Sequence, residues 1–139
     1  MNNENAKLKS IEEALSEDGF AMHNVVGCSM LPLLNSKTDR VLLISPRALR
    51  VGDIALYKRG SDYVLHRIIE IKKQGEKLYK MRGDNCGFAD ALLKESEIIA
   101  VLNGFWRGDK YIEDLRLQRT HPLFILKVRD CLKKILKRL

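Results

Sequence analysis

The chain has 139 residues, of which 45% are hydrophobic and 31% charged, a size that suits one domain and is too short for two. Only three prolines and nine glycines occur, which excludes collagen-like and generally disordered classes. The net charge is +7, and residues 111–139 alone carry eight Lys and Arg against three Asp and Glu. Because the positive charge is concentrated in one C-terminal segment, we expect no nucleic-acid partner.

The first predicted element is an amphipathic helix over residues 5–18, with Leu8, Ile11 and Leu15 at helical spacing and Gly19 as its stop signal. Short β-like runs separated by turns follow from residue 22 to about 112. The expected strands are Arg40–Ser45, Asp53–Lys58, Tyr63–Lys72, Lys77–Arg82, Glu97–Leu102 and Asp109–Ile112.

After Pro122 the helical period returns, and basic residues flank its apolar stripe. We therefore predict a mainly β fold, a small sheet or barrel with a short N-terminal helix and a basic amphipathic C-terminal helix. Residues 1–139 form a single domain in this interpretation, with a β core at 20–112 and the C-terminal helix at 122–139.

The cysteines Cys28, Cys86 and Cys131 show no CxxC spacing, and the three histidines are scattered. We therefore expect no metal site and no cofactor, and free thiols in a reducing compartment. The polar N-terminus lacks the features of a secretory signal, and no apolar run approaches the ~20 residues of a membrane span. These features predict a cytoplasmic protein without a transmembrane anchor.

Three segments contain residues suited to catalysis. Ser29 lies in the run from Val26 to Pro32, where glycine and proline predict a sharp bend that can expose a hydroxyl beside free backbone N–H groups. His66 lies in the most strand-like run, sheltered on a half-apolar face where it could act as a general base. The third segment contains two aspartates. Asp84 lies in a Gly-Asp-Asn turn, and Asp90 follows six residues after it.

Each segment also has an ordinary structural interpretation. Ser29 could be a plain turn residue and His66 a core histidine, while Asp84 could bond only its own turn. Asp90 could be the N-cap of a helix that starts at Ala91.

Four short sequence motifs, or boxes, follow one another along the chain. They are Gly27-Cys-Ser-Met-Leu-Pro32, Gly52-Asp-Ile54, Leu65-His-Arg-Ile-Ile69 and Gly83-Asp-Asn85, the last with a second aspartate six residues after its own. From about Val25 to Leu102 the chain resembles the signal peptidase I superfamily, which includes self-cleaving repressors. A histidine at the general-base position is similar to the endoplasmic-reticulum and archaeal type.

The resemblance implies a Ser-His-Asp site without metal or cofactor. In the implied site, Ser29 is the nucleophile and His66 is the general base. Asp90 is the residue that orients His66, and Asp84 is a supporting aspartate. Gly27 stands where the family usually has a serine whose hydroxyl helps to hold the oxyanion. Two alternatives are that Cys28 is the nucleophile, or that Cys28 and Cys86 form a redox lock.

These features predict a serine endopeptidase that cleaves a leader or signal-like peptide from a precursor peptide or protein. One alternative is a self-cleaving regulator, and another is a non-catalytic peptide- or membrane-binding module on the same fold. The basic helix at residues 123–139 either packs on the sheet or lies on an anionic membrane surface. In the second case the protein is peripheral at the inner face of the membrane.

Overall fold

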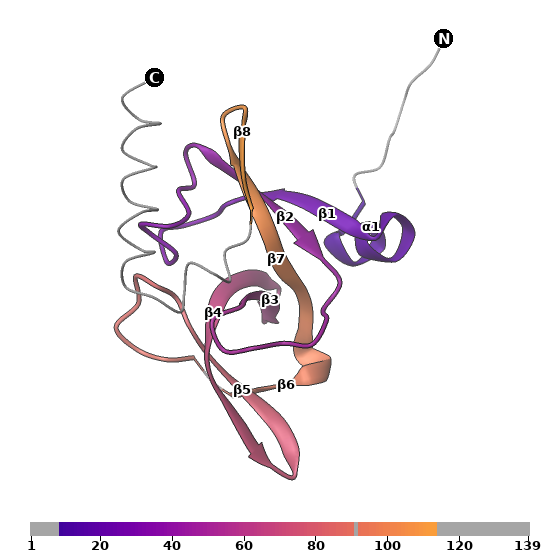
Figure 1. The fold of residues 1–139 in the computed structure, drawn as a ribbon, viewed down its shortest axis with the longest axis vertical. Coiled ribbons are helices and arrows are strands. Elements are labelled where there is room, and N and C mark those ends of the chain that lie inside the picture. Colours follow the sequence, from indigo (N-terminus) through magenta and orange to yellow (C-terminus); the bar gives the residue numbers. More distant parts are fainter. Residues whose placement is uncertain (1–8, 91, 114–139) are drawn as a thin grey trace.

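The computed structural model describes residues 9–90 and 92–113, which form one helix, one short 3-10 turn and eight strands (Figure 1). The elements are α1 (Ile11–Asp18), β1 (Phe20–Asn24), β2 (Asp39–Ile44), β3 (Ile54–Arg59), β4 (Asp62–Gln74), β5 (Glu76–Arg82), β6 (Leu92–Lys94), η1 (Glu95–Glu97), β7 (Ile98–Arg107) and β8 (Lys110–Glu113). The predicted mainly β class with a short N-terminal helix is confirmed. The predicted helix at 122–139 lies outside the described residues.

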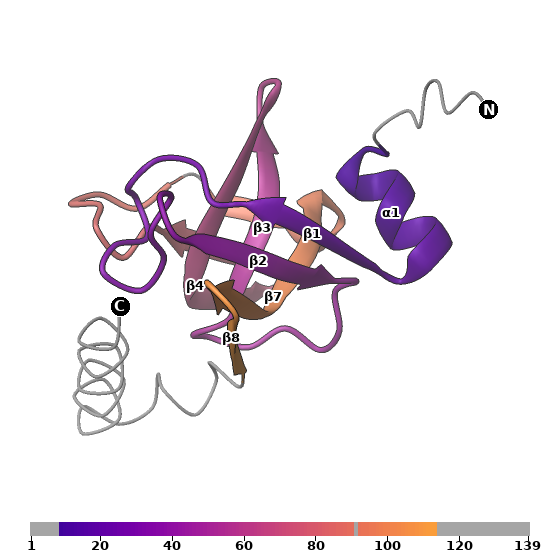
Figure 2. The same ribbon diagram turned by 90° about the horizontal axis from the view of Figure 1, so that it is seen from above.

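The strands form one antiparallel sheet in the order β1-β2-β7-β3-β4-β5-β6, with β8 paired to β7. The register shifts between Leu42 and Leu43, between Leu56 and Tyr57, and between Ile68 and Glu70. Such irregularities bend and twist a sheet, and β1 and β2 run across the direction of β3 and β4 (Figure 2). The bend gives the sheet two packed interiors.

Strand β3 separates these two interiors. Ile54 and Leu56 belong to the core that also holds α1, β1 and β2, whereas Ala55 and Tyr57 belong to the core under β4 and β5. Successive side chains of a strand point to opposite faces, so a strand buried on both faces is apolar throughout. β3 and its neighbour β4 therefore form the rigid centre on which a site can be built.

Helix α1 covers one end of the first core (Figure 2). The Ser10 side chain caps its N-terminus by accepting a hydrogen bond from the Glu13 N–H at 3.1 Å. Gly19 ends it with a φ of 82°, a conformation that glycine adopts without steric strain. Ile11 and Leu15 are buried as predicted, and Leu8 lies outside the described residues.

A buried ion pair fastens the segment between β1 and β2 to the sheet. The Arg107 guanidinium donates to both carboxylate oxygens of Asp39, at 2.8 and 2.6 Å, and to the backbone oxygen of Leu33 at 3.1 Å. Asp39 also accepts a hydrogen bond from the Asn35 N–H at 2.8 Å. The loop that carries Ser29 is therefore fixed at its C-terminal end.

Six predicted strands are present, with bounds that shift by up to five residues. The prediction missed β1 and β6, and the interpretation of Asp90 as a helix N-cap is wrong because residues 92–94 form strand β6. β6 pairs with β5 through Leu93 opposite Tyr79, so burial of Leu93 against the sheet outweighs the helix propensity of its sequence. Among the described residues, no helix has the length and apolar character needed to cross a bilayer.

Candidate active site

Ser29 lies in the loop between β1 and β2, which is held against the loop after β5. The Asn85 N–H donates to the backbone oxygen of Ser29 at 2.8 Å, and the Asn85 side-chain amide donates to the backbone oxygen of Cys28 at 3.1 Å. Gly27 has a φ of 76°, which makes the sharp bend expected before Ser29. Within the described residues, the backbone N–H of Ser29 has no acceptor in the chain.

His66 lies on β4 directly opposite Ala55 of β3, and only 4% of it is exposed. Its Nδ1 atom is hydrogen-bonded to Oδ2 of Asp90. An ionised carboxylate is an acceptor only, so the proton in this bond belongs to Nδ1. In the neutral ring, Nε2 is then left as a proton acceptor.

Asp90 is held by three side chains from β3 and β4. Besides His66, it accepts hydrogen bonds from the Tyr57 hydroxyl and from the Arg59 guanidinium, the latter at 2.6 Å. Partial burial acts to raise the pKa of Asp90, but hydrogen bonds from Tyr57 and His66 and the positive charges of His66 and Arg59 outweigh it and lower this pKa. Asp90 is therefore a carboxylate at neutral pH.

Ser29, His66 and Asp90 line the same cavity of about 470 Å³. Gly83 lies close to both Ser29 and His66. If Gly83 carried a Cβ atom, that atom would lie 2.7 Å from the Ser29 backbone oxygen and 3.0 Å from His66 Nε2. Within the described residues, no hydrogen bond joins the Ser29 hydroxyl to His66. Three of the four expected residues therefore line one cavity, in which Asp90 meets Nδ1 and Nε2 lies toward the backbone of Ser29, while Asp84 is not part of the cavity wall.

Asp84 occupies a different position from Asp90. Its carboxylate forms a bidentate pair with Arg67, at 2.7 and 2.6 Å, and Arg67 also donates to the backbone oxygen of Gly52 at 3.0 Å. The Asp84 N–H donates to the Met30 sulfur at 3.4 Å. Asp84 thus contacts the residue that follows Ser29 and the residue that follows His66, without touching the imidazole.

Sequence reasoning missed Tyr57 and Arg59. Tyr57 falls within the predicted strand Asp53–Lys58 and Arg59 directly after it, and neither position indicates a role in the site. Residues 55 and 57 share a face of β3, and β3 pairs Ala55 with His66. The diagonal neighbour of His66 across the strand pair is therefore Tyr57, and this pairing register was the available signal.

The remaining expectations concern cysteines and metals. Cys28 is exposed and Cys86 half-buried, and both are free thiols, so no disulfide links them. Cys131 lies outside the described residues. In residues 9–90 and 92–113, no cluster of His, Cys, Asp and Glu has the arrangement of a metal site.

The chain is similar to "Signal peptidase I W" of Bacillus subtilis (strain 168), with 32% identity over 94 residues. The match covers 63% of this chain and 48% of that protein, so the chain spans about half the length of its relative. No family model matches the chain. No solved structure matches it either. The similarity supports the signal peptidase I superfamily and does not distinguish the endoplasmic-reticulum and archaeal type within it.

Proposed function

We propose that this protein is a serine endopeptidase of the signal-peptidase type, which cleaves a leader or signal-like peptide from a precursor. Ser29 is the nucleophile, His66 the general base and Asp90 the residue that orients His66. Asp84 supports the site through its carboxylate pair with Arg67 and through its backbone N–H, which donates to the Met30 sulfur. The observation that carries the proposal is the Asp90–His66 bond at Nδ1, with Nε2 beside Ser29 in one cavity.

The chemistry follows from this arrangement. As the Ser29 oxygen attacks the peptide carbonyl, its proton passes to His66 Nε2, and the imidazolium is stabilised by Asp90 across Nδ1. His66 then returns the proton to the leaving amine. The Ser29 N–H, which has no acceptor among the described residues, can donate to the developing oxyanion, and Gly27 adds no side-chain donor to it.

The cavity suggests how a peptide is bound. Its walls combine apolar side chains from β2 and β3, namely Val41, Leu43 and Leu56, with the polar groups of the site. An apolar cleft with a few fixed polar groups is the usual form of a substrate site. The relative's name, a signal peptidase, supports a peptide or protein substrate. We further propose that the protein acts in the cytoplasm, and that it works at the inner face of the membrane if its basic segment at residues 123–139 binds anionic lipid.

The test is peptide cleavage by the purified full-length protein. A mixture of peptides representing leader and signal sequences is incubated with the protein, and new termini are identified by mass spectrometry. We expect cleavage after particular residues, and a loss of at least about 10³-fold in Ser29→Ala and in His66→Ala, because each removes a reacting group.

Ser36→Ala is the matched control, since Ser36 is an exposed serine of the same loop. It should cleave at the wild-type rate. Full activity in folded Ser29→Ala would exclude Ser29 as nucleophile. No cleavage of any peptide by the wild type would favour the non-catalytic binding module.

A further inference from the structure

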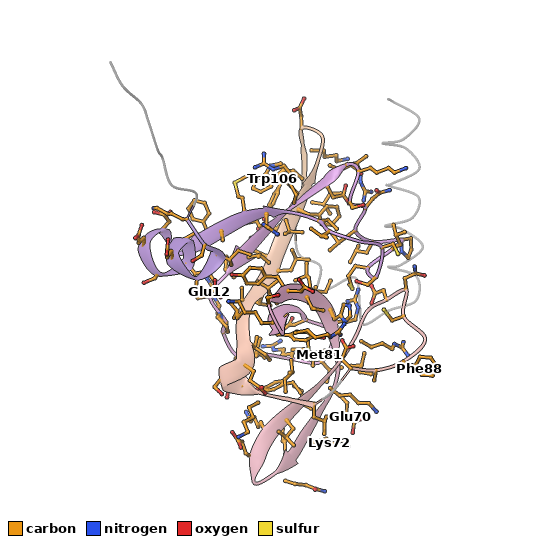
Figure 3. The ribbon with its side chains drawn as sticks, turned by 180° about the vertical axis from the view of Figure 1, so that it is seen from behind. Glu12, Glu70, Lys72, Met81, Phe88 and Trp106 are labelled. Carbon is orange, nitrogen blue, oxygen red and sulfur yellow. The ribbon has the colours of Figure 1, made fainter. Side chains whose placement is uncertain are left out.

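The loop after β5 holds Cys86 at a fixed place in the cavity wall. The Cys86 N–H donates to the backbone oxygen of Gly83 at 2.9 Å, and the preceding Asn85 N–H donates to Ser29. Cys86 is half-buried and lines the cavity with His66 and Asp90. Phe88, two residues later, is 89% exposed and projects from the edge of the molecule (Figure 3). Both residues line the cavity, but Cys86 is half-buried in its wall whereas Phe88 is mostly exposed.

The Cys86 sulfur and His66 Nε2 both lie close to Gly83. If Gly83 carried a Cβ atom, that atom would lie 2.7 Å from Cys86 Sγ and 3.0 Å from His66 Nε2. Nε2 has no hydrogen-bond partner within the described residues, although the imidazole is almost fully buried. A buried ring nitrogen without a partner is a ready acceptor for the proton of a neighbouring thiol.

We propose that Cys86 is a second nucleophile of this cavity, and that it is the site at which soft alkylating electrophiles modify the protein. With iodoacetamide, the sulfur forms a bond to the methylene carbon, the carbon–iodine bond breaks and iodide leaves. The thiol proton passes to His66 Nε2. The added group then lies in the cavity beside Ser29, so under the proposed function it also stops peptide cleavage.

The test measures alkylation directly, without a peptide substrate. Full-length protein is treated with iodoacetamide at pH 7, and the adduct at each cysteine is followed over time by peptide mass spectrometry. Cys28 is the internal control, because it is exposed and directly precedes Ser29. We expect Cys86 to react at least about tenfold faster than Cys28, because the buried His66 Nε2 lies close to its sulfur as a proton acceptor. A Cys86 rate equal to or below that of Cys28 would overturn the proposal.

Two further measurements separate the role of His66 from simple access. In folded His66→Gln, the Cys86 rate should fall to about that of Cys28, while the Cys28 rate stays unchanged; an unchanged Cys86 rate would refute the assignment. In urea-unfolded wild type, the two cysteines should react at similar rates, which makes the difference a property of the fold. Since no peptide is cleaved in these assays, failure here is distinguishable from failure of the proposed peptidase function.

Discussion

Tyr57 and His66 share one acceptor, the Oδ2 atom of the Asp90 carboxylate. The Tyr57 oxygen also lies 3.4 Å from His66 Nδ1, and only 3% of Tyr57 is exposed. Arg59 binds the other oxygen of Asp90 at 2.6 Å. A carboxylate held at both oxygens cannot rotate freely, so Tyr57 and Arg59 fix the direction in which Asp90 meets the imidazole.

Tyr57→Phe should therefore lower kcat for peptide cleavage by about tenfold, since it keeps the buried ring and removes one hydrogen bond to a charged group. KM should stay nearly constant, because the lost hydroxyl contacts Asp90. Steady-state kinetics on a cleaved peptide measures both. Tyr79→Phe is the control, because Tyr79 is buried in the same core away from Asp90. An equal loss in the control would assign the effect to packing.

The lowered pKa of Asp90 predicts a pH-dependent contribution to stability. Partial burial works against this shift, but hydrogen bonds from Tyr57 and His66 and the nearby positive charges bring the pKa below the ordinary value of 3.8. A carboxyl with a lowered folded-state pKa stabilises the fold above its unfolded value, and the gain is lost as the pH falls through the folded value.

The free energy of unfolding of Asp90→Asn should thus be about 1–3 kcal/mol lower than that of wild type at pH 7. This difference should shrink below about pH 4. Urea unfolding at several pH values measures it. Asp62→Asn, at the exposed β3–β4 hairpin, should show little difference at any pH. A pH-independent gap for Asp90→Asn would contradict the linkage.

The buried pair of Asp39 and Arg107 should contribute strongly to stability. Arg107→Met leaves the Asp39 carboxylate buried without its cation, which costs about 3–5 kcal/mol. Lys80→Met is the comparison, because Lys80 and Glu70 form a largely exposed pair at 3.8 Å. It should cost no more than about 1 kcal/mol. Urea midpoints compare the two, and equal losses would mean that burial does not set the strength of these pairs.

Sequence reasoning selected four candidate residues but missed Tyr57 and Arg59, which hold Asp90. Ser29, His66, Asp84 and Asp90 were identified from four short boxes, and the structure places three of them on one cavity. The resemblance assigned the contact with His66 to Asp90, but residue spacing alone did not distinguish Asp90 from Asp84. The turn that contains Asp84 directs its carboxylate to Arg67. That direction depends on contacts between distant segments and not on residue spacing.

The strands show the same limit. Runs with β-branched residues, such as Tyr63–Lys72, were recognised because strand propensity and alternation agree there. Residues 92–94 were not, since Leu92, Leu93 and Lys94 favour a helix locally and form a strand only by pairing with β5. β1 was missed because only Ala21 of its five residues is buried.

Gly27 offers a direct test of the oxyanion site. Its φ is 76°, and a Cβ atom there would meet no heavy atom within 4 Å. Gly27→Ser and Gly27→Ala should therefore share a similar backbone strain, about 1 kcal/mol, and differ only in the hydroxyl. If that hydroxyl reaches the oxyanion, kcat of the serine variant should exceed that of the alanine variant by about tenfold or more. Equal kcat values would place the hydroxyl out of reach.

The last prediction concerns membrane binding by residues 123–139, which lie outside the described residues. This segment carries six Lys and Arg against one Asp, beside an apolar stripe at helical spacing. Each basic residue near an anionic surface contributes on the order of 1 kcal/mol, so six can give weak, salt-sensitive attachment. We expect the full-length protein to co-sediment with anionic vesicles at low salt and less at high salt.

Two variants identify the segment responsible. A chain ending at His121 and a full-length chain with three lysines of this segment changed to glutamine (Lys133, Lys134 and Lys137) should both lose binding. The same change at the exposed β4–β5 hairpin (Lys72, Lys73 and Lys77) removes equal charge and should leave binding intact, because attachment requires charge beside an apolar face rather than net charge alone. Equal recovery of all forms, or no binding of the wild type at low salt, would make the C-terminal segment a structural element only.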